Sequence, residues 1–460
     1  MSARRWMPWI SLLATLLGAW LGTRLWYDYD TYDWLTKYLR RDFGTGAPLY
    51  SRWWPVDLSI LAARVRLVTA IDAMLLTVVL LLVTQYRLWP RFISTTIAVL
   101  GVVGINASVA AIRSGEASVE APFMRTSLEY IGVVPMVNDD PLRFMREYPS
   151  LNNQLTVHPG THPPGGVLVL WAGSKLFGPS VFAATWLAIG FGALFILPAR
   201  ALARTVAGPA AMRRATLLCL VAPNLVLLGA TSMDAVFNAF LLTALALGVI
   251  AVKKQSIWRS IVAGIALWLA AFMTFTAVLV PVLVTLYAVL SGPWRWLRRG
   301  LAVAVIGLTF LACQQLSLHL IGYDFFACVR AAMERDEMSV RMTGYESFEI
   351  WSSVSVSNLA AVVFGGGLAL IGPVVVAFFR SAVRPWKSQA RFALAAILGL
   401  LVLCGSTCFT LETERVLITM TPALIVAAST VLRGRILMAI VLLLLSAQTI
   451  WTELNLYTHW

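Results

Sequence analysis

The charges of this chain are divided between alternate loops of a long apolar sequence. With the apolar stretches taken as membrane spans, one set of loops holds 20 Lys or Arg and no Asp or Glu. All 22 acidic residues then lie on or near the opposite side. Basic residues in short loops resist translocation, so the basic side is predicted to be cytoplasmic. We expect a fold set by the membrane, with the N-terminus in the cytoplasm and the C-terminus outside.

Thirteen apolar stretches are long enough to cross a bilayer, which takes about 17–25 residues. They lie near 8–26, 67–86, 91–112, 181–203, 213–230, 234–251, 256–272, 275–292, 299–320, 355–379, 390–409, 415–432 and 435–453. The stretch 164–178 is short and contains a Lys and several glycines, so it is predicted to be an interfacial or re-entrant helix on the outer face. The sequence therefore predicts an all-α, polytopic protein with about 13 transmembrane helices plus this helix.

Composition supports the membrane class and argues against nucleic-acid binding. The chain is 59% hydrophobic and 13% charged, which is typical of a multi-pass protein of a cell (inner or plasma) membrane. Its net charge of +14 is spread singly and in pairs over many loops. Anchoring to anionic lipid head groups explains that surplus better than nucleic acid does.

The outer loop 113–164 carries the residues with the most chemical potential. Two of the four histidines, His158 and His162, lie close together in it, directly before Pro163. The loop also contains the acids Glu116, Glu120, Glu129, Asp139, Asp140 and Glu147. By itself this pattern fits a solvated acidic loop with a Pro-Gly turn. The pairing of histidines with a Pro-Pro turn before an interfacial helix favours a functional site.

Three segments of the chain, in order and on one face, resemble the GT-C superfamily of integral-membrane glycosyltransferases. They are the acidic segment 140–147 with the turn THPPG at 161–165, then TSMDAVFNAFLL with Asp234, then LETERVLITMTP near the C-terminus. The closest branch is that of the protein O-mannosyltransferases and the lipid A aminoarabinose transferase. The similarity covers about residues 91–432.

The chain departs from that family in two respects. Gly165 stands where the family has Leu after the Pro-Pro turn, and the acidic loop follows the third span rather than the first. Residues 1–90 are therefore predicted to be an added N-terminal hairpin before a catalytic membrane domain at 91–460. The alternative is that the acid-rich loop 27–66 is the catalytic one, although it lacks the His-Pro-Pro continuation.

The resemblance implies inverting transfer of a hexosyl or pentosyl group from a polyprenyl-phosphate donor to a lipid, glycan or protein acceptor on the outer face. One carboxylate suffices as the general base. Asp140 or Asp139 is the first choice and Glu129 the next. Asp140 is also a candidate N-cap of a helix that begins at Pro141, and the two roles are compatible.

The donor phosphate needs cations or hydrogen-bond donors at the membrane surface. The candidate substrate-binding residues are Arg143, Arg146, His158, His162, Asp234, Glu412, Glu414 and Arg415. We expect Asp234 to pair with Arg415 or a loop base, because an unpartnered carboxylate at a span end is costly. We also expect Asp140, His162 and Asp234 to converge. No cofactor is indicated with certainty, and a Mg²⁺ or Mn²⁺ ion remains an alternative to a metal-free site.

A transporter or lipid flippase is the alternative function. Transporters place ionisable residues deep in the bilayer. In this chain only Asp72 enters a predicted span appreciably, near its outer end. The glycosyltransferase is therefore the preferred hypothesis.

Overall fold

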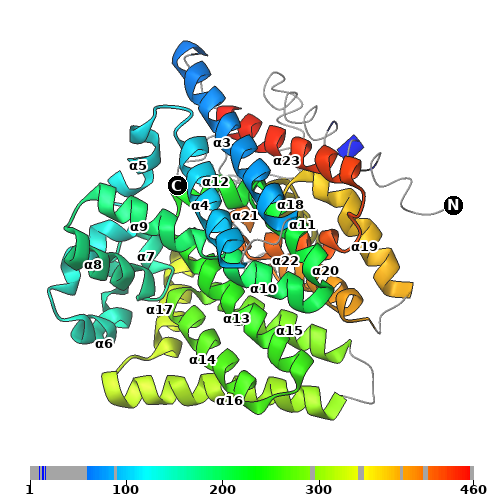
Figure 1. Cartoon of the computed structure of the whole chain (residues 1–460). Helices are drawn as coiled ribbons and strands as arrows, with labels where there is room; N and C mark the ends of the chain where they lie inside the picture. The colour runs from blue at the N-terminus through cyan, green and yellow to red at the C-terminus, as the bar shows by residue number, and fades with distance from the viewer. Residues whose placement is uncertain are drawn as a thin grey trace.

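A computed structural model describes residues 60–86, 91–290, 296–339, 347–383, 387–407 and 413–455, with isolated positions near the N-terminus. Every regular element among these residues is a helix, which confirms the all-α prediction. The elements form one helical body with its short helices gathered at one edge (Figure 1).

Seven helices of the described chain are long and apolar enough to cross a membrane. They are α3 (Ile60–Tyr86), α4 (Arg91–Ala110), α9 (Val181–Ala193) continued by α10 (Ile196–Ala207), α13 (Asp234–Lys254), α16 (Trp296–Ile321), α20 (Ser388–Gly405) and α23 (Arg435–Asn455). The multi-pass membrane assignment is therefore supported by the structure.

Two helix pairs are long and apolar enough only when their members are taken together, and each pair is bent at a short break. The pair α11 (Pro209–Cys219) and α12 (Pro223–Thr231) turns by 58°, and α12 begins at a proline. The helix α18 (Phe348–Gly366) meets η6 (Leu368–Leu370) and α19 (Ile371–Val383) at 96°. This second break falls at Gly367, whose φ of +112° favours glycine.

Three shorter apolar helices complete the membrane part. They are α14 (Ile257–Met273), α15 (Leu279–Val289) with its leading turn η4 (Phe275–Val278), and α22 (Met420–Ser429). Each predicted stretch other than 8–26 coincides with a helix or pair named here, and 8–26 lies almost wholly outside the described residues. Length and composition give seven spans in the described chain, or nine with each bent pair as one, so the count of 13 is not confirmed.

Short helices form a cap beside the spans. Most of them lie between α4 and α9 in the chain: α5 (Glu116–Met124), η2 (Tyr130–Val137), α6 (Pro141–Leu151), η3 (Asn152–Gln154), α7 (Val157–Gly160) and α8 (Gly165–Phe177). The helix α17 (Phe325–Ser339) lies next to them (Figure 1). The 13 residues of α8 extend about 20 Å, too short for a bilayer core of about 30 Å. This length agrees with the prediction that the segment does not span.

Polar contacts join helix ends that the charge pattern assigns to the same side. At the end predicted to be cytoplasmic, here called the inner end, the contacts are Arg214 Nε to Ser429 O (2.7 Å) and Tyr287 Oη to Ser388 Oγ (2.8 Å). At the opposite, outer end they are Trp351 Nε1 to Gly405 O (2.8 Å) and Arg113 Nε to Glu453 Oε1 (3.1 Å). These contacts are consistent with the predicted alternation. The division at residue 90 remains a prediction, and α3 packs directly on α4.

The predicted topology can be tested with reporter tags. Tags after Arg204, Lys254 and Lys387 should report the cytoplasm, because these positions lie in the basic loops that are predicted to be cytoplasmic. Tags near Ser118, Glu337 and Trp460 should report the outside. A cytoplasmic report at Trp460 would show that one of the spans, or the segment 164–178, is assigned incorrectly.

Candidate active site

Four side chains from three distant parts of the chain form one line of polar contacts at the outer end. Glu129 Oε1 lies 3.3 Å from His158 Nε2. Arg415 Nη2 lies 3.1 Å from His158 Nδ1, and Arg415 Nε lies 2.8 Å from Asp234 Oδ2. None of the four side chains is more than 13% exposed. The predicted pairing of Asp234 with Arg415 is therefore confirmed.

The direction of these contacts determines the protonation of His158. A guanidinium has only N–H groups and cannot accept a hydrogen bond, so Arg415 must donate to Nδ1. The proton of the neutral imidazole is then on Nε2, which faces the Glu129 carboxylate. His158 thus links the Glu129 carboxyl group on one side to the Arg415 guanidinium on the other.

Backbone contacts hold Glu129 and His158 together. The His158 N–H donates to Leu128 O at 3.1 Å, and Thr156 Oγ1 donates to Glu129 O at 3.0 Å. Glu129 is the residue directly before η2, whose apolar side chains pack inward. This packing directs the Glu129 side chain into the protein interior, and the residue is 5% exposed.

The His-Pro-Pro turn packs against the start of α13. The His162 ring stacks on Phe237 with a centroid distance of 5.3 Å, and Tyr130 meets both rings edge-on. The His162 Nδ1 atom lies 3.1 Å from the His158 carbonyl oxygen. In the Nδ1-protonated tautomer of His162, this oxygen accepts a hydrogen bond from the ring N–H. Phe237 follows Asp234 by one helical turn, so the turn and Asp234 share one site.

Tyr130 lies within electrostatic reach of both carboxylates. Burial raises the pKa of its hydroxyl well above the usual value, Asp234 and Glu129 raise it further, and Arg415 opposes them. The phenol therefore stays protonated at neutral pH.

Three threonines of the C-terminal segment anchor the backbone around Arg415. Thr413 and Thr419 donate to the side-chain oxygens of Asn358 and Asn238, at 2.6 and 2.8 Å. Thr421 accepts from the Asn224 amide at 2.9 Å. None of these residues was among the site residues predicted from the sequence. The signal was available, because an Asn inside an apolar span is costly unless it is paired.

The helix α17 braces the loop before His158 from the other side. Arg335 donates to the carbonyl oxygen of Asn152 and to that of Leu155, the latter at 3.1 Å. In the described part of the outer loop 321–354, α17 packs on α6 and η3. Residues 340–346 lie outside the described chain.

The other predicted site residues have separate positions. Asp140 is exposed and caps α6, where it accepts from Arg143 N at 2.9 Å. Asp139 forms an exposed ion pair with Lys175, which lowers the pKa of its carboxyl. The Arg143 side chain pairs with Glu147 at 2.9 Å and is exposed.

Arg146 is also exposed. Glu412 lies outside the described residues, and so does the side chain of Glu414. Of the residues predicted from sequence, the structure brings together Glu129, His158, His162, Asp234 and Arg415. The expected convergence with Asp140 remains a prediction.

The carboxylates of the cluster do not fit a resident divalent ion. Within the described chain, no three His, Cys, Asp or Glu residues are grouped to hold one. Asp234 faces the Arg415 guanidinium and the Ser232 hydroxyl, and Glu129 faces an imidazole N–H. Each acid is thus directed at a donor of the protein rather than at a second carboxylate.

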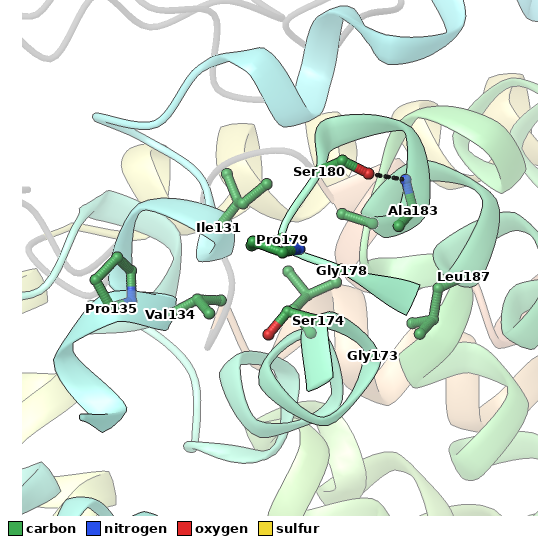
Figure 2. Close-up of a pocket in the computed structure, with 12 residues that line it drawn as sticks. Ile131, Val134, Pro135, Gly173, Ser174, Gly178, Pro179, Ser180, Ala183 and Leu187 are labelled. Carbon is green, nitrogen blue, oxygen red and sulfur yellow. Dashed lines mark hydrogen bonds between the residues drawn. The ribbon is translucent and has the colours of Figure 1, made fainter. Parts of the chain in front are cut away.

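An apolar cavity of about 220 Å³ lies between η2, α8 and α9. Ile131 and Val134 form one wall, and Gly173 and Leu187 line it from the two helices (Figure 2). None of the four polar cluster residues lines it. The cavity therefore offers apolar surface along η2, the helical turn that directly follows Glu129.

The close packing around Gly165 explains why this chain has glycine where the GT-C enzymes it resembles have Leu. A Cβ here would meet the Phe272 carbonyl oxygen and lie 2.6 Å from Met273 Sδ. Gly165→Leu should destabilise the protein by about 1–3 kcal/mol through overpacking. Thermal unfolding of the purified protein would measure this loss. Gly190→Ala is the control, since a Cβ at Gly190 meets nothing within 4 Å, and equal melting of both variants would contradict the prediction.

Comparison with known proteins finds a family that one part of the chain resembles. Residues 161–317 match the family model of dolichyl-phosphate-mannose-protein mannosyltransferase. The predicted resemblance to GT-C glycosyltransferases is confirmed. The matched segment begins at the His-Pro-Pro turn and includes Asp234, so it contains the second of the three motifs and the turn of the first, but not the acidic segment 140–147. No curated protein matches the chain.

Solved structures give a weaker likeness. The Archaeoglobus fulgidus oligosaccharyltransferase is 15% identical over 68% of this chain and 49% of its own, with a TM-score of 0.42. ArnT from Cupriavidus metallidurans is 16% identical over 68% of this chain and 73% of its own, with a TM-score of 0.30. The chain thus spans about half the length of the archaeal enzyme.

Proposed function

We propose that this chain is a membrane glycosyltransferase that moves a sugar from a polyprenyl-phosphate donor to an acceptor on the outer face of a cell (inner or plasma) membrane. The observation that carries the proposal is the buried line Glu129–His158–Arg415–Asp234 at the outer end. The matched family description, which names a dolichyl-phosphate sugar, supports the donor class.

Arg415 is the residue that we assign to the leaving phosphate. When the anomeric C–O bond breaks, negative charge develops on the phosphate oxygen, and a fixed guanidinium in a site of low polarity stabilises that charge. Asp234 and His158 hold the guanidinium from two sides. A positioned cation is more effective than a mobile one, because no reorganisation is needed during the reaction.

Glu129 is the residue that we assign as general base. In a single displacement, the acceptor oxygen attacks the anomeric carbon, its proton passes to Glu129, and polyprenyl phosphate leaves with the bonding electrons. The anomeric centre is thereby inverted. Asp234 is less suited to this role, because its Oδ2 already contacts Arg415 and accepts from the Ser232 hydroxyl at 2.5 Å.

The proposed acceptor is a molecule on the outer face, because the site lies at the outer end of the helices. An oxygen nucleophile on a lipid, a glycan or a protein can reach a site at the outer end, and the apolar cavity beside η2 suits an acceptor with an apolar part. A hexose and a pentose remain equal candidates for the transferred sugar.

A transfer assay tests the proposal. Membranes with and without the chain are supplied with polyprenyl-phosphate sugars labelled in the sugar, and the label is followed into lipid, glycan and protein fractions. Label should appear in one fraction only when the chain is present. Movement of the intact donor across the bilayer without transfer would overturn the proposal and support the transporter or flippase alternative.

A further inference from the structure

Arg200 is a buried cation at the inner end of the helices. It lies on α10, is 7% exposed, and donates to Thr216 Oγ1 at 3.1 Å and Ser94 Oγ at 3.2 Å. Within the described chain it forms no ion pair with a carboxylate. The sequence explains this, since α4, α10 and α11 contain no Asp or Glu. A buried charge without a counter-charge is costly, so an anionic ligand is expected here.

Other cations surround the same cavity. It measures about 410 Å³ and is lined by Arg91, Arg204 and Arg213 in addition to Arg200, with Thr84 and Thr95 adding hydroxyls. The lining has no acidic residue. Planar guanidinium groups bind phosphate oxygens through paired hydrogen bonds. Charge and donor geometry therefore match a phosphate group.

An apolar groove of about 520 Å³ adjoins this arginine cavity. Leu197 and Ala201 of α10 line both spaces. The groove continues between α10, α13 and α14 toward the outer end, past Leu247 and Phe240. A molecule with an anionic head and an apolar chain can therefore occupy the cavity and the groove at the same time.

We propose that these two spaces form a binding site for an anionic glycerophospholipid of the cytoplasmic leaflet. Its phosphate is bound by Arg200, Arg204 and the neighbouring hydroxyls, and an acyl chain lies in the groove along α13. Free phosphate cannot use the groove, whereas a lipid uses both parts. The site is separate from the outer cluster and does not depend on the proposed transfer reaction.

Lipid-dependent thermal stability tests this proposal with the full chain, purified in detergent and stripped of lipid. A ligand that binds only the folded state raises Tm as its concentration increases. Phosphatidylglycerol should raise Tm with saturation. Phosphatidylcholine with the same acyl chains, and inorganic phosphate alone, should give little shift. Native mass spectrometry should show one retained phosphatidylglycerol.

Two arginine variants and a groove variant locate the effect. Arg204→Gln should weaken phosphatidylglycerol binding about fivefold, the value of one basic residue near a lipid head group. Arg200→Gln should weaken it more than about tenfold through the lost buried contact. Ala201→Trp should have a comparable effect by filling the shared wall. Arg298→Gln is the matched control, since Arg298 is exposed on α16 and lies outside the lining of both spaces.

Several results would overturn the lipid site. They are an equal Tm shift with phosphatidylcholine, a full shift with inorganic phosphate alone, and equal losses in Arg204→Gln and Arg298→Gln. Should Arg200→Gln fail to fold because its hydroxyl contacts are lost, Arg204→Gln and Ala201→Trp still decide the question.

Discussion

Replacing Arg415 with Gln should reduce sugar transfer by about 10²–10³-fold, the loss seen when one preorganised donor to a developing negative charge is removed. Gln keeps a hydrogen-bond donor but has no charge, and it cannot contact Asp234 and His158 as the guanidinium does. The loss should be in kcat more than in KM, because the charge on the leaving phosphate is largest in the transition state.

Arg415→Lys separates charge from geometry. A lysine ammonium is a single point charge and cannot replace two contacts made by different nitrogen atoms, so we expect most of the defect to remain. The control is Arg330→Gln, which removes an exposed arginine from the outer helix α17. Full activity in Arg415→Lys would show that a positive charge alone is sufficient, and full activity in Arg415→Gln would remove Arg415 from the mechanism.

Stability must be measured with these variants. Removing one partner of a buried ion pair typically costs about 3–5 kcal/mol, because the other charge stays buried. Asp234→Asn combined with Arg415→Gln removes both charges and should recover part of the lost stability without recovering transfer. This double variant therefore distinguishes a folding defect from a chemical one.

The sequence was informative about the side of the membrane on which each group lies. The charge pattern assigned His158, His162, Asp234 and Arg415 to the outer side, and the cost of a lone carboxylate at a span end predicted the pair of Asp234 with Arg415. Both statements depend on the membrane as a solvent, which acts on every loop in the same way. Hydropathy located the spans for the same reason.

The sequence was less informative about which loop acid turns inward. Asp140 was preferred because the segment 140–147 resembles the family's acidic motif, yet the following Pro141 begins a helix that Asp140 caps as an exposed residue. Glu129 precedes the apolar run of η2, and the burial of that run carries the acid into the protein. Such orientation depends on tertiary packing within a loop, which residue spacing does not determine. The bends at Pro223 and Gly367 were not predicted for the same reason.

Glu129→Gln should reduce turnover by about 10²–10⁴-fold, the contribution of a general base. The amide keeps the size of the side chain and can accept from His158 Nε2, so the protein should remain folded and inserted. Glu116→Gln is the matched control, since Glu116 is an exposed acid of the same loop. Turnover from single-turnover transfer assays is the measurement.

Asp140→Asn distinguishes the two carboxylate candidates. Asn caps helices nearly as well as Asp, so this change preserves α6 and removes only the charge. With Glu129 as the base, Asp140→Asn and Asp139→Asn should keep near-normal transfer. A collapse of turnover in Asp140→Asn, with Glu129→Gln active, would assign the base to Asp140. Normal turnover in all three would direct attention to the loop 27–66, which contains Asp28, Asp30 and Asp33.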